Sequence, residues 1–333
     1  MHGGVSDHED LLARRRGRID LTFRRAPDGG TFLGRQYASY PFHICRPHRY
    51  VGDPSGMATL YLQSVAGGLF ESDRLEVRIA AEPGSALHVT SQASTVVHSM
   101  TRDHAEHAVT IKAGEGALVE YLPDATILFP QARLASRIQV QAHETASVIC
   151  ADAFLAHDPS GSSAMFDRLD SDMTVAGPTG QVLVRDKFRI TGDLLKRNLP
   201  GLNGPWIAQA TVMVIHRGPS LEALLENIRA ELEPLPDIFA GASRLPGEVG
   251  VWTRILACDG HALRTAVLAV WACAREQMTA KRPGVAANRS EGHADRPRQV
   301  PSPARGYAGA AASGCRRRRE NVAESRSSSR SGR

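Results

Sequence analysis

A turn followed by an apolar strand recurs about every thirty residues in the middle of this chain, which is the spacing of a repeat architecture. The three copies are Pro83–Leu87, Gly114–Leu118 and His143–Ser147. In a solenoid, each strand pair stacks on the previous one. The alternative is that any β-rich chain has turns at recurrent spacing. The repeat therefore predicts a mainly β fold, a helix-like (β-solenoid-like) stack of strands.

Alternating apolar segments predict further strands on both sides of the repeat. After His216 the pattern changes, and we expect a small C-terminal helical part with one helix at Ser220–Leu232, capped by Ser220, and another at Ala262–Arg275. The predicted strands are Arg18–Arg25, Thr31–Ala38, Met57–Ser64, Leu75–Ala80, Ala86–Gln92, His107–Lys112, Ala117–Leu122, Leu134–Gln141, Ala146–Cys150, Gln181–Ile190 and Trp206–His216.

Charge and composition divide the chain into three parts. Residues 278–333 hold 13 of the 40 basic residues and 4 of the 35 acidic ones, a net +9 that leaves −4 for residues 1–277. This Pro-, Gly-, Ser- and Arg-rich stretch predicts a disordered basic tail. We expect a poorly ordered leader at 1–17 and one β-rich domain at 18–277. The acidic body makes nucleic acid an improbable partner, except for an RNA-binding role of the tail.

The sequence also bounds where the protein works. No apolar run reaches the ~20 residues of a membrane span, and the first residues lack the apolar region of a secretion signal. The five cysteines, an odd number without regular spacing, predict reduced thiols rather than a disulfide framework. These features predict a cytoplasmic protein without a membrane partner.

Motifs of catalysis are missing from the sequence. It contains no HExxH, CxxC or GxSxG motif and no phosphate-binding loop, so we expect no enzyme activity. His98, His104 and His107 lie close together and are a candidate site for nickel or zinc. The alternative is a polar surface loop.

Acidic residues recur where strands are expected to begin or end. Asp73 follows the glycine pair Gly67 and Gly68, which we expect to form a turn. Oxygen ligands spread along a path hold an ion weakly, which suits transfer rather than storage. Simpler alternatives are a solvated turn for Asp73 and an ion pair for Asp186. The candidate path for a hydrated cation comprises Asp73, Ser94, Glu120, Asp152 and Asp186.

Three blocks in this order identify a family resemblance. They are the GG-x4-D block at Gly67–Asp73, the Thr-x-Gln-Ala-x-Thr block at Thr90–Thr95 and the Glu-Tyr-Leu-Pro-Asp block at Glu120–Asp124. Together with the surrounding strands, they resemble the urease accessory protein D family, also called H, from about Arg18 to Arg275.

The resemblance implies a non-enzymatic scaffold of stacked strands. It implies binding to apo-urease and, through the accessory protein F, to the GTPase G, so that nickel is conducted to the urease active site and not stored. The family's proposed nickel route falls on Asp73, Ser94, Asp152 and Asp186, and Glu120 matches a recurrent acid.

The chain also departs from the family pattern. Ser72 stands where the family usually has glycine, and the family ends soon after its last helix, so a divergent or frameshifted terminus is our expectation for the tail. The alternative function is a β-solenoid protein that binds or acts on polysaccharide. The 5% aromatic content is low for sugar platforms.

Overall fold

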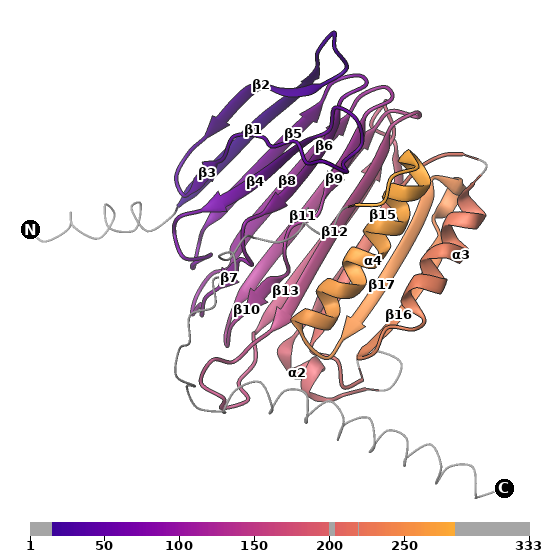
Figure 1. Ribbon diagram of the computed structural model, residues 1–333. Helices are drawn as coiled ribbons and strands as arrows, with labels where there is room; N and C mark the ends of the chain where they lie inside the picture. The colour runs from indigo at the N-terminus through magenta and orange to yellow at the C-terminus, as the bar shows by residue number, and fades with distance from the viewer. Residues whose placement is uncertain (1–14, 200–203, 219, 284–333) are drawn as a thin grey trace, which may run out of the picture.

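Two β-sheets face each other, and the chain builds them by passing repeatedly from one to the other (Figure 1). The computed structural model describes residues 15–199, 204–218 and 220–283. The fold is mainly β, with a solenoid-like stacking of strands and a small helical part near the C-terminal end of the described chain, as predicted.

The first sheet has seven strands, and its middle strands are parallel and in register. Antiparallel strands close both of its edges. In spatial order the strands are β14 (Val182–Ile190), β13 (Arg168–Ala176), β11 (Arg133–Ala142), β8 (Ala105–Ala113), β5 (Arg74–Ala81), β1 (Arg16–Arg25) and β2 (Thr31–Ala38).

The second sheet has ten strands and continues beyond the solenoid as an antiparallel extension. Its main path in space is β16 (Ile238–Arg244), β17 (Gly250–Ala257), β15 (Ala208–Ile215), β12 (Ser147–Ala156), β9 (Leu118–Tyr121), β6 (Ala86–Ser91), β4 (Ala58–Ser64) and β3 (Phe42–Ile44). Off this path, β10 (Thr126–Leu128) pairs with β12 and with β7 (Val96–Val97).

The predicted repeat of turns is confirmed by its hydrogen bonds. Each turn is closed by the same contact, from Ser85 N to Glu82 O, from Ala117 N to Gly114 O and from Ala146 N to His143 O, each 3.1 Å long. Successive turns are also joined, because Gly84 N donates to Glu115 O at 2.7 Å. Identical turns stacked in this way fix the parallel register of both sheets.

Two helices cover the outer face of the second sheet (Figure 1). They are α3 (Leu221–Leu232) and α4 (Gly260–Thr279), at the predicted places, with Ser220 as the N-cap residue of α3. The prediction that the chain stays helical after His216 is wrong, because β16 and β17 lie between the helices. A short helix, α2 (Gly192–Lys196), and a 3₁₀ turn, η1 (Pro246–Glu248), complete the elements. β13 was also not predicted.

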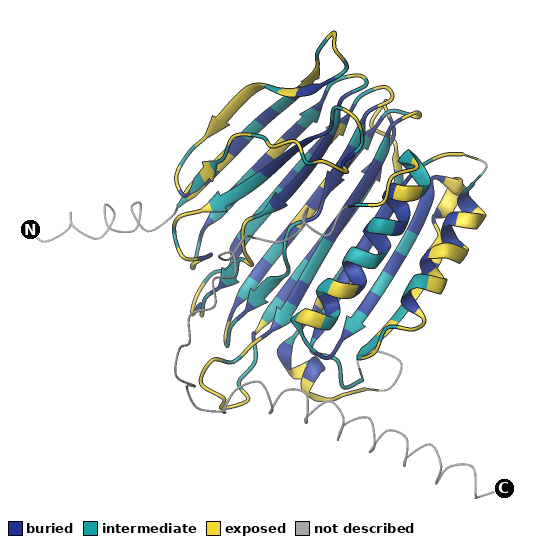
Figure 2. Cartoon of the chain, in the orientation of Figure 1, coloured by how far each residue is buried: buried dark blue, intermediate teal, exposed yellow. Residues whose placement is uncertain are grey.

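Apolar side chains fill both layers. Two clusters lie between the sheets, and a third lies between the outer face of the second sheet and the two helices. Buried and exposed residues alternate along many strands, and the helices turn their buried residues toward the sheet (Figure 2). The second sheet is therefore covered on both faces, and each of its strands sends alternate side chains into different surroundings.

The expected domain limits fall partly on described residues. β1 begins at Arg16, inside the expected leader, and α4 extends to Thr279, past the expected start of the tail. Residues 1–14 and 284–333 lie outside the described residues.

Cys45, Cys150 and Cys273 are free thiols, but Cys258 is disulfide-bonded, so the expectation of reduced thiols is wrong there. Within the described residues, no helix is long and apolar enough to cross a membrane.

Candidate functional site

A layer of polar side chains interrupts the apolar core between the two sheets. In the first sheet, His107, Ser136 and Ser171 are register partners on neighbouring strands, so their side chains share the inner face. In the second sheet, Asp152 and Thr211 are register partners on β12 and β15. Asp152 lies inside β12, not after the strand as predicted, because β12 extends to Ala156.

Asp152 is held between the sheets by hydroxyl groups. Ser171 Oγ donates to its carboxylate at 2.7 Å, and Ser136 Oγ lies 3.5 Å from both oxygens. Burial raises the pKa of Asp152, while the serine hydroxyls and the nearby Arg254 guanidinium oppose this shift. Among the described residues the carboxylate forms no ion pair, and hydroxyl groups alone donate hydrogen bonds to it.

Asp186 lies in the first sheet, on β14 next to the strand that carries Ser171, and it has an ion-pair partner. Arg254 Nη2 contacts its two carboxylate oxygens at 3.0 and 2.7 Å, and Thr211 Oγ1 donates to it at 3.3 Å. The guanidinium also lies over the rings of Phe188 and Trp252, 4.8 and 5.0 Å from their centroids. Burial lowers the pKa of Arg254. The alternative expectation for Asp186, an ion pair, is confirmed, but its partner comes from β17 of the facing sheet and not from a neighbouring strand.

Two adjoining cavities lead from the loops at the strand ends toward Asp152. The larger, of about 230 Å³, is lined by the loop residues Gly67, Gly68 and Ser94. The smaller, of about 60 Å³, is lined by Ser136 and Asp152. Residues that line both include Phe42, Ser64, Gly68, Thr95, His107, Tyr121 and Pro123. The two cavities therefore adjoin between the sheets, and polar groups line them together with apolar side chains such as Val77 and Val109.

A third cavity, of about 180 Å³, lies beside α4 and meets this space at the second sheet. Strand β9 ends at Tyr121 and β10 begins at Thr126, and the segment between them lines cavities on both sides. Arg264 from α4 forms an ion pair there with Asp124. Burial raises the pKa of Asp124, and Arg264 opposes the shift. Residues 122–125 therefore separate the two cavities, and the ion pair lies on this segment.

The glycine pair forms the predicted turn. Gly67 and Gly68 have φ of 71° and 132°, and a Cβ on Gly68 would lie 2.4 Å from Val96 O. Ser72 has a φ of 65°, which explains why glycine suits this position.

Asp73 stabilises this turn from inside. It is fully buried, forms an ion pair with Arg15 and accepts a hydrogen bond of 2.7 Å from Phe70 N. It does not line either cavity between the sheets.

Glu120 lies on the opposite face of the second sheet from Tyr121, against α4. It accepts hydrogen bonds from Trp271 Nε1 at 2.8 Å, His88 Nδ1 at 2.8 Å and Arg275 Nε at 2.7 Å. Burial raises the pKa of Glu120, but the bonds from Arg275 and His88 outweigh it and bring the pKa to about 2.

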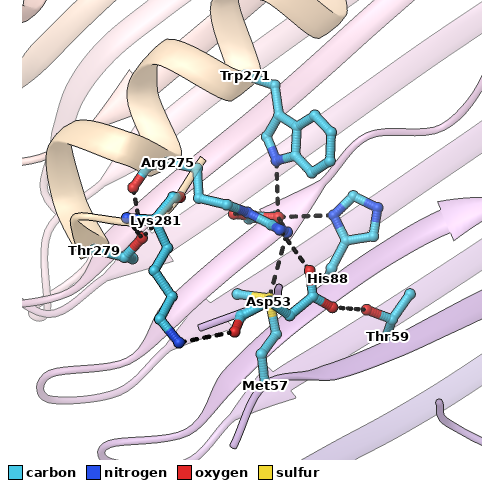
Figure 3. A network of polar contacts seen from close by, with 9 residues as sticks. Asp53, Met57, Thr59, His88, Trp271, Arg275, Thr279 and Lys281 are labelled. Carbon is cyan, nitrogen blue, oxygen red and sulfur yellow. Dashed lines mark hydrogen bonds and ion pairs between the residues drawn. The ribbon is translucent and has the colours of Figure 1, made fainter. Parts of the chain in front are cut away.

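Arg275 completes this network by reaching a loop far away in the sequence. Its Nη1 donates to Asp53 Oδ1 at 2.7 Å, and its guanidinium lies 4.5 Å from the centroid of Trp271. Figure 3 shows Arg275 and Trp271 pointing from α4 toward His88 and Asp53. The Glu120 network is therefore a structural fastening of α4 to the sheet.

The three histidines near position 100 do not come together. His98 stacks on Phe70 at a centroid distance of 4.3 Å, and His104 pairs with Asp103 and Glu106 at the surface. His107 instead points between the sheets, where burial lowers its pKa to about 4. Among the described residues, no group of three or more His, Cys, Asp or Glu is arranged to hold a metal ion.

Comparison with known proteins decides the family. The model of the UreD urease accessory protein family matches residues 15–288. The chain belongs to the UreD family. It is 42% identical over 282 residues to urease accessory protein UreD 1 of Pseudomonas syringae pv. syringae, an alignment that covers 84% of this chain and 99% of the relative.

More distant UreD proteins match over similar lengths. Identity is 35% to UreD 1 of Methylorubrum populi, over 81% of this chain and 91% of the relative. It is 30% to UreD of Haloarcula marismortui, over 79% and 87%. Membership of the UreD family supports a role in urease maturation, and the relatives are named as accessory proteins, not as enzymes.

The residues that sequence reasoning missed are those whose neighbours come from distant strands. Arg254, Tyr121, Ser136 and Ser171 were not candidates, although all of them surround Asp152 or its neighbour Asp186. The signal that could have found Ser136 and Ser171 is a serine on the apolar face of an alternating strand, because such a face normally excludes hydroxyls.

Proposed function

We propose that this UreD chain is a maturation scaffold that joins apo-urease to the accessory proteins F and G, and that nickel passes through it to the urease active site. The observation that carries the proposal is the pair of adjoining cavities between the sheets, one lined by Gly67 and Ser94 and the other by Asp152. Its cytoplasmic location is part of the proposal.

The chemistry of the space supports passage of a hydrated cation. The larger cavity holds hydroxyl and amide side chains from the Thr90–Thr95 block, and the smaller one holds the Asp152 carboxylate. A carboxylate that lacks a guanidinium of its own attracts a cation, and hydroxyl groups can replace part of its hydration shell. Weak ligands spread along the path would let the ion leave again.

The five predicted residues divide in this proposal. Ser94 lies at the rim shared by the first and third cavities, Asp152 lies inside, and Asp186 is its paired neighbour. Asp73 stabilises the turn at Gly67 and Gly68, which lines the larger cavity. We assign Glu120 to the fastening of α4, so its contribution to nickel passage is indirect.

The proposal is tested by co-expressing the chain with the urease subunits and the accessory proteins. The variants Asp152→Ala and Asp186→Ala are expected to reduce nickel per urease active site while the complex still forms. A matched control is Asp170→Ala, since Asp170 lies on the outer face of the first sheet and pairs with Arg189. Full nickel content in both interior variants would overturn passage through this space and leave a scaffold alone.

A further inference from the structure

One half-buried imidazole that faces the space beside the Asp152 carboxylate has no hydrogen-bond partner among the described residues. His107 projects from β8 and lines both cavities between the sheets. None of the hydrogen bonds or ion pairs found among the described residues involves its imidazole, whereas the nearby His98 and His104 both have partners. Polar groups pair with protein atoms or with water, so an imidazole that faces a cavity without a protein partner is open to water or to a ligand there.

The surroundings of His107 supply oxygen donors. Its register partner on β11 is Ser136, whose hydroxyl lies 3.5 Å from the Asp152 carboxylate. Asp152 and Tyr121 line the smaller cavity together with His107. The imidazole of one sheet and the carboxylate of the other therefore border the same 60 Å³ space, which is large enough for an ion with a few waters.

We propose that His107 and Asp152 form a transient site for a divalent first-row transition metal, with water and hydroxyl groups completing its coordination. This inference rests on the proposed function for the identity of its cargo. It adds a selectivity step: the path would favour nickel over the far more abundant magnesium and calcium.

The selectivity follows from the donor set. Imidazole nitrogen suits nickel, cobalt, copper and zinc, whereas magnesium and calcium prefer oxygen ligands alone. Two protein ligands are fewer than a storage site needs, and this agrees with the absence of any larger ligand cluster among the described residues. A site with one imidazole can therefore select an ion without retaining it.

The test compares metal binding by the full-length chain in its maturation complex. Isothermal titration with Ni²⁺, Co²⁺ and Mg²⁺ is made on the native chain, on His107→Gln and on the control His104→Gln, whose imidazole lies at the surface. We expect His107→Gln to weaken the Ni²⁺ and Co²⁺ binding assigned to this chain at least ~10-fold, with no change for Mg²⁺. The control should bind all three ions as the native chain does.

A second variant protects the test against misfolding of the first. Asp152→Asn keeps the shape of the side chain and should weaken Ni²⁺ binding as well, and circular dichroism reports whether each variant is folded. Unchanged Ni²⁺ binding in folded His107→Gln would overturn the inference. That result leaves the proposed function intact if Asp152→Ala still lowers the nickel content of urease, so the two failures can be told apart.

Discussion

Strand β9 sends two adjacent side chains into two different polar regions. Glu120 enters the region against α4, where Arg275, His88 and Trp271 donate hydrogen bonds to it, and it lines none of the three cavities described above. Tyr121 enters the region between the sheets, where cavities surround Asp152 and His107. The Glu120 carboxylate is satisfied by strong donors, although His88 Nε2 beside it has no hydrogen-bond partner among the described residues. The Asp152 carboxylate accepts hydrogen bonds from hydroxyl groups only.

The difference shows in how the two acids respond to burial. Both are desolvated, yet the pKa of Glu120 falls to about 2 and that of Asp152 rises. The carboxylate that strong donors satisfy belongs to the framework, and the one that only hydroxyls satisfy retains the capacity to attract a cation. The donors around each carboxylate thus distinguish Glu120 from Asp152, which their positions along strands do not.

The largest expected effect on stability comes from removing Arg275 from the Glu120 network. Arg275→Met leaves Glu120 and Asp53 buried without their cation, so the free energy of unfolding should fall by ~3–5 kcal/mol. Chemical denaturation measures this change. The control Arg282→Met removes exposed pairs with Glu231 and Glu276 near the end of the same helix and should cost at most ~1 kcal/mol. Equal losses in both would contradict the role of the Glu120 network.

Acid should weaken the same region. Because the folded-state pKa of Glu120 lies below its unfolded value of 4.5, its contribution is present above pH 4.5 and is lost as the pH falls toward about 2. Denaturation curves of the native chain and of Glu120→Gln over this range should converge as the pH falls. A constant difference between them would mean that Glu120 is not the group that titrates.

The contribution of Asp152 to stability should change with pH in the opposite direction to that of Glu120. The raised pKa of Asp152 means that its charged form destabilises the fold, a cost present above the folded pKa and relieved as acid protonates it. At neutral pH, Asp152→Asn should leave the free energy of unfolding unchanged or raise it by up to ~1 kcal/mol. A loss of stability above ~2 kcal/mol would place Asp152 with the framework acids instead.

The smallest loss of stability is expected at residues 122–125, the segment between the second and third cavities. Asp124→Asn removes the ion pair with the partly exposed Arg264, and the free energy of unfolding should fall by less than ~1 kcal/mol. If nickel passes between the cavities at Asp124, the variant should change urease activation although its stability hardly changes. Activation measured in co-expressing cells checks this, with Arg24→Met, which breaks the surface pair with Glu82, as the control.

Local chemistry explains which parts of this molecule could be predicted. The alternation of Leu75, Val77 and Ile79 and the turn glycines act within a few residues, so strands, turns and the solenoid repeat follow from the sequence. Strands β16 and β17 escaped prediction because no strand was expected between the helices at Ser220–Leu232 and Ala262–Arg275.

The candidate site could be predicted only in part, because the partners of each acid come from strands and helices that are distant in the sequence. Asp152 and Glu120 both look like acids near strand ends, and nothing within a few residues shows that Arg275, 155 positions away from Glu120, saturates one of them. For the same reason, His107 could not be separated from His98 and His104 until the faces of β8 were known.

The most direct test of the central claim compares these two acids in one assay. Asp152→Leu and Glu120→Gln are co-expressed with the urease subunits and accessory proteins, and nickel per urease active site is measured after normalising to the amount of assembled complex. We predict that Asp152→Leu lowers nickel per assembled complex, whereas Glu120→Gln lowers only the amount of complex. Normal nickel in Asp152→Leu with depleted nickel in Glu120→Gln would contradict the division between a transit region and a structural one.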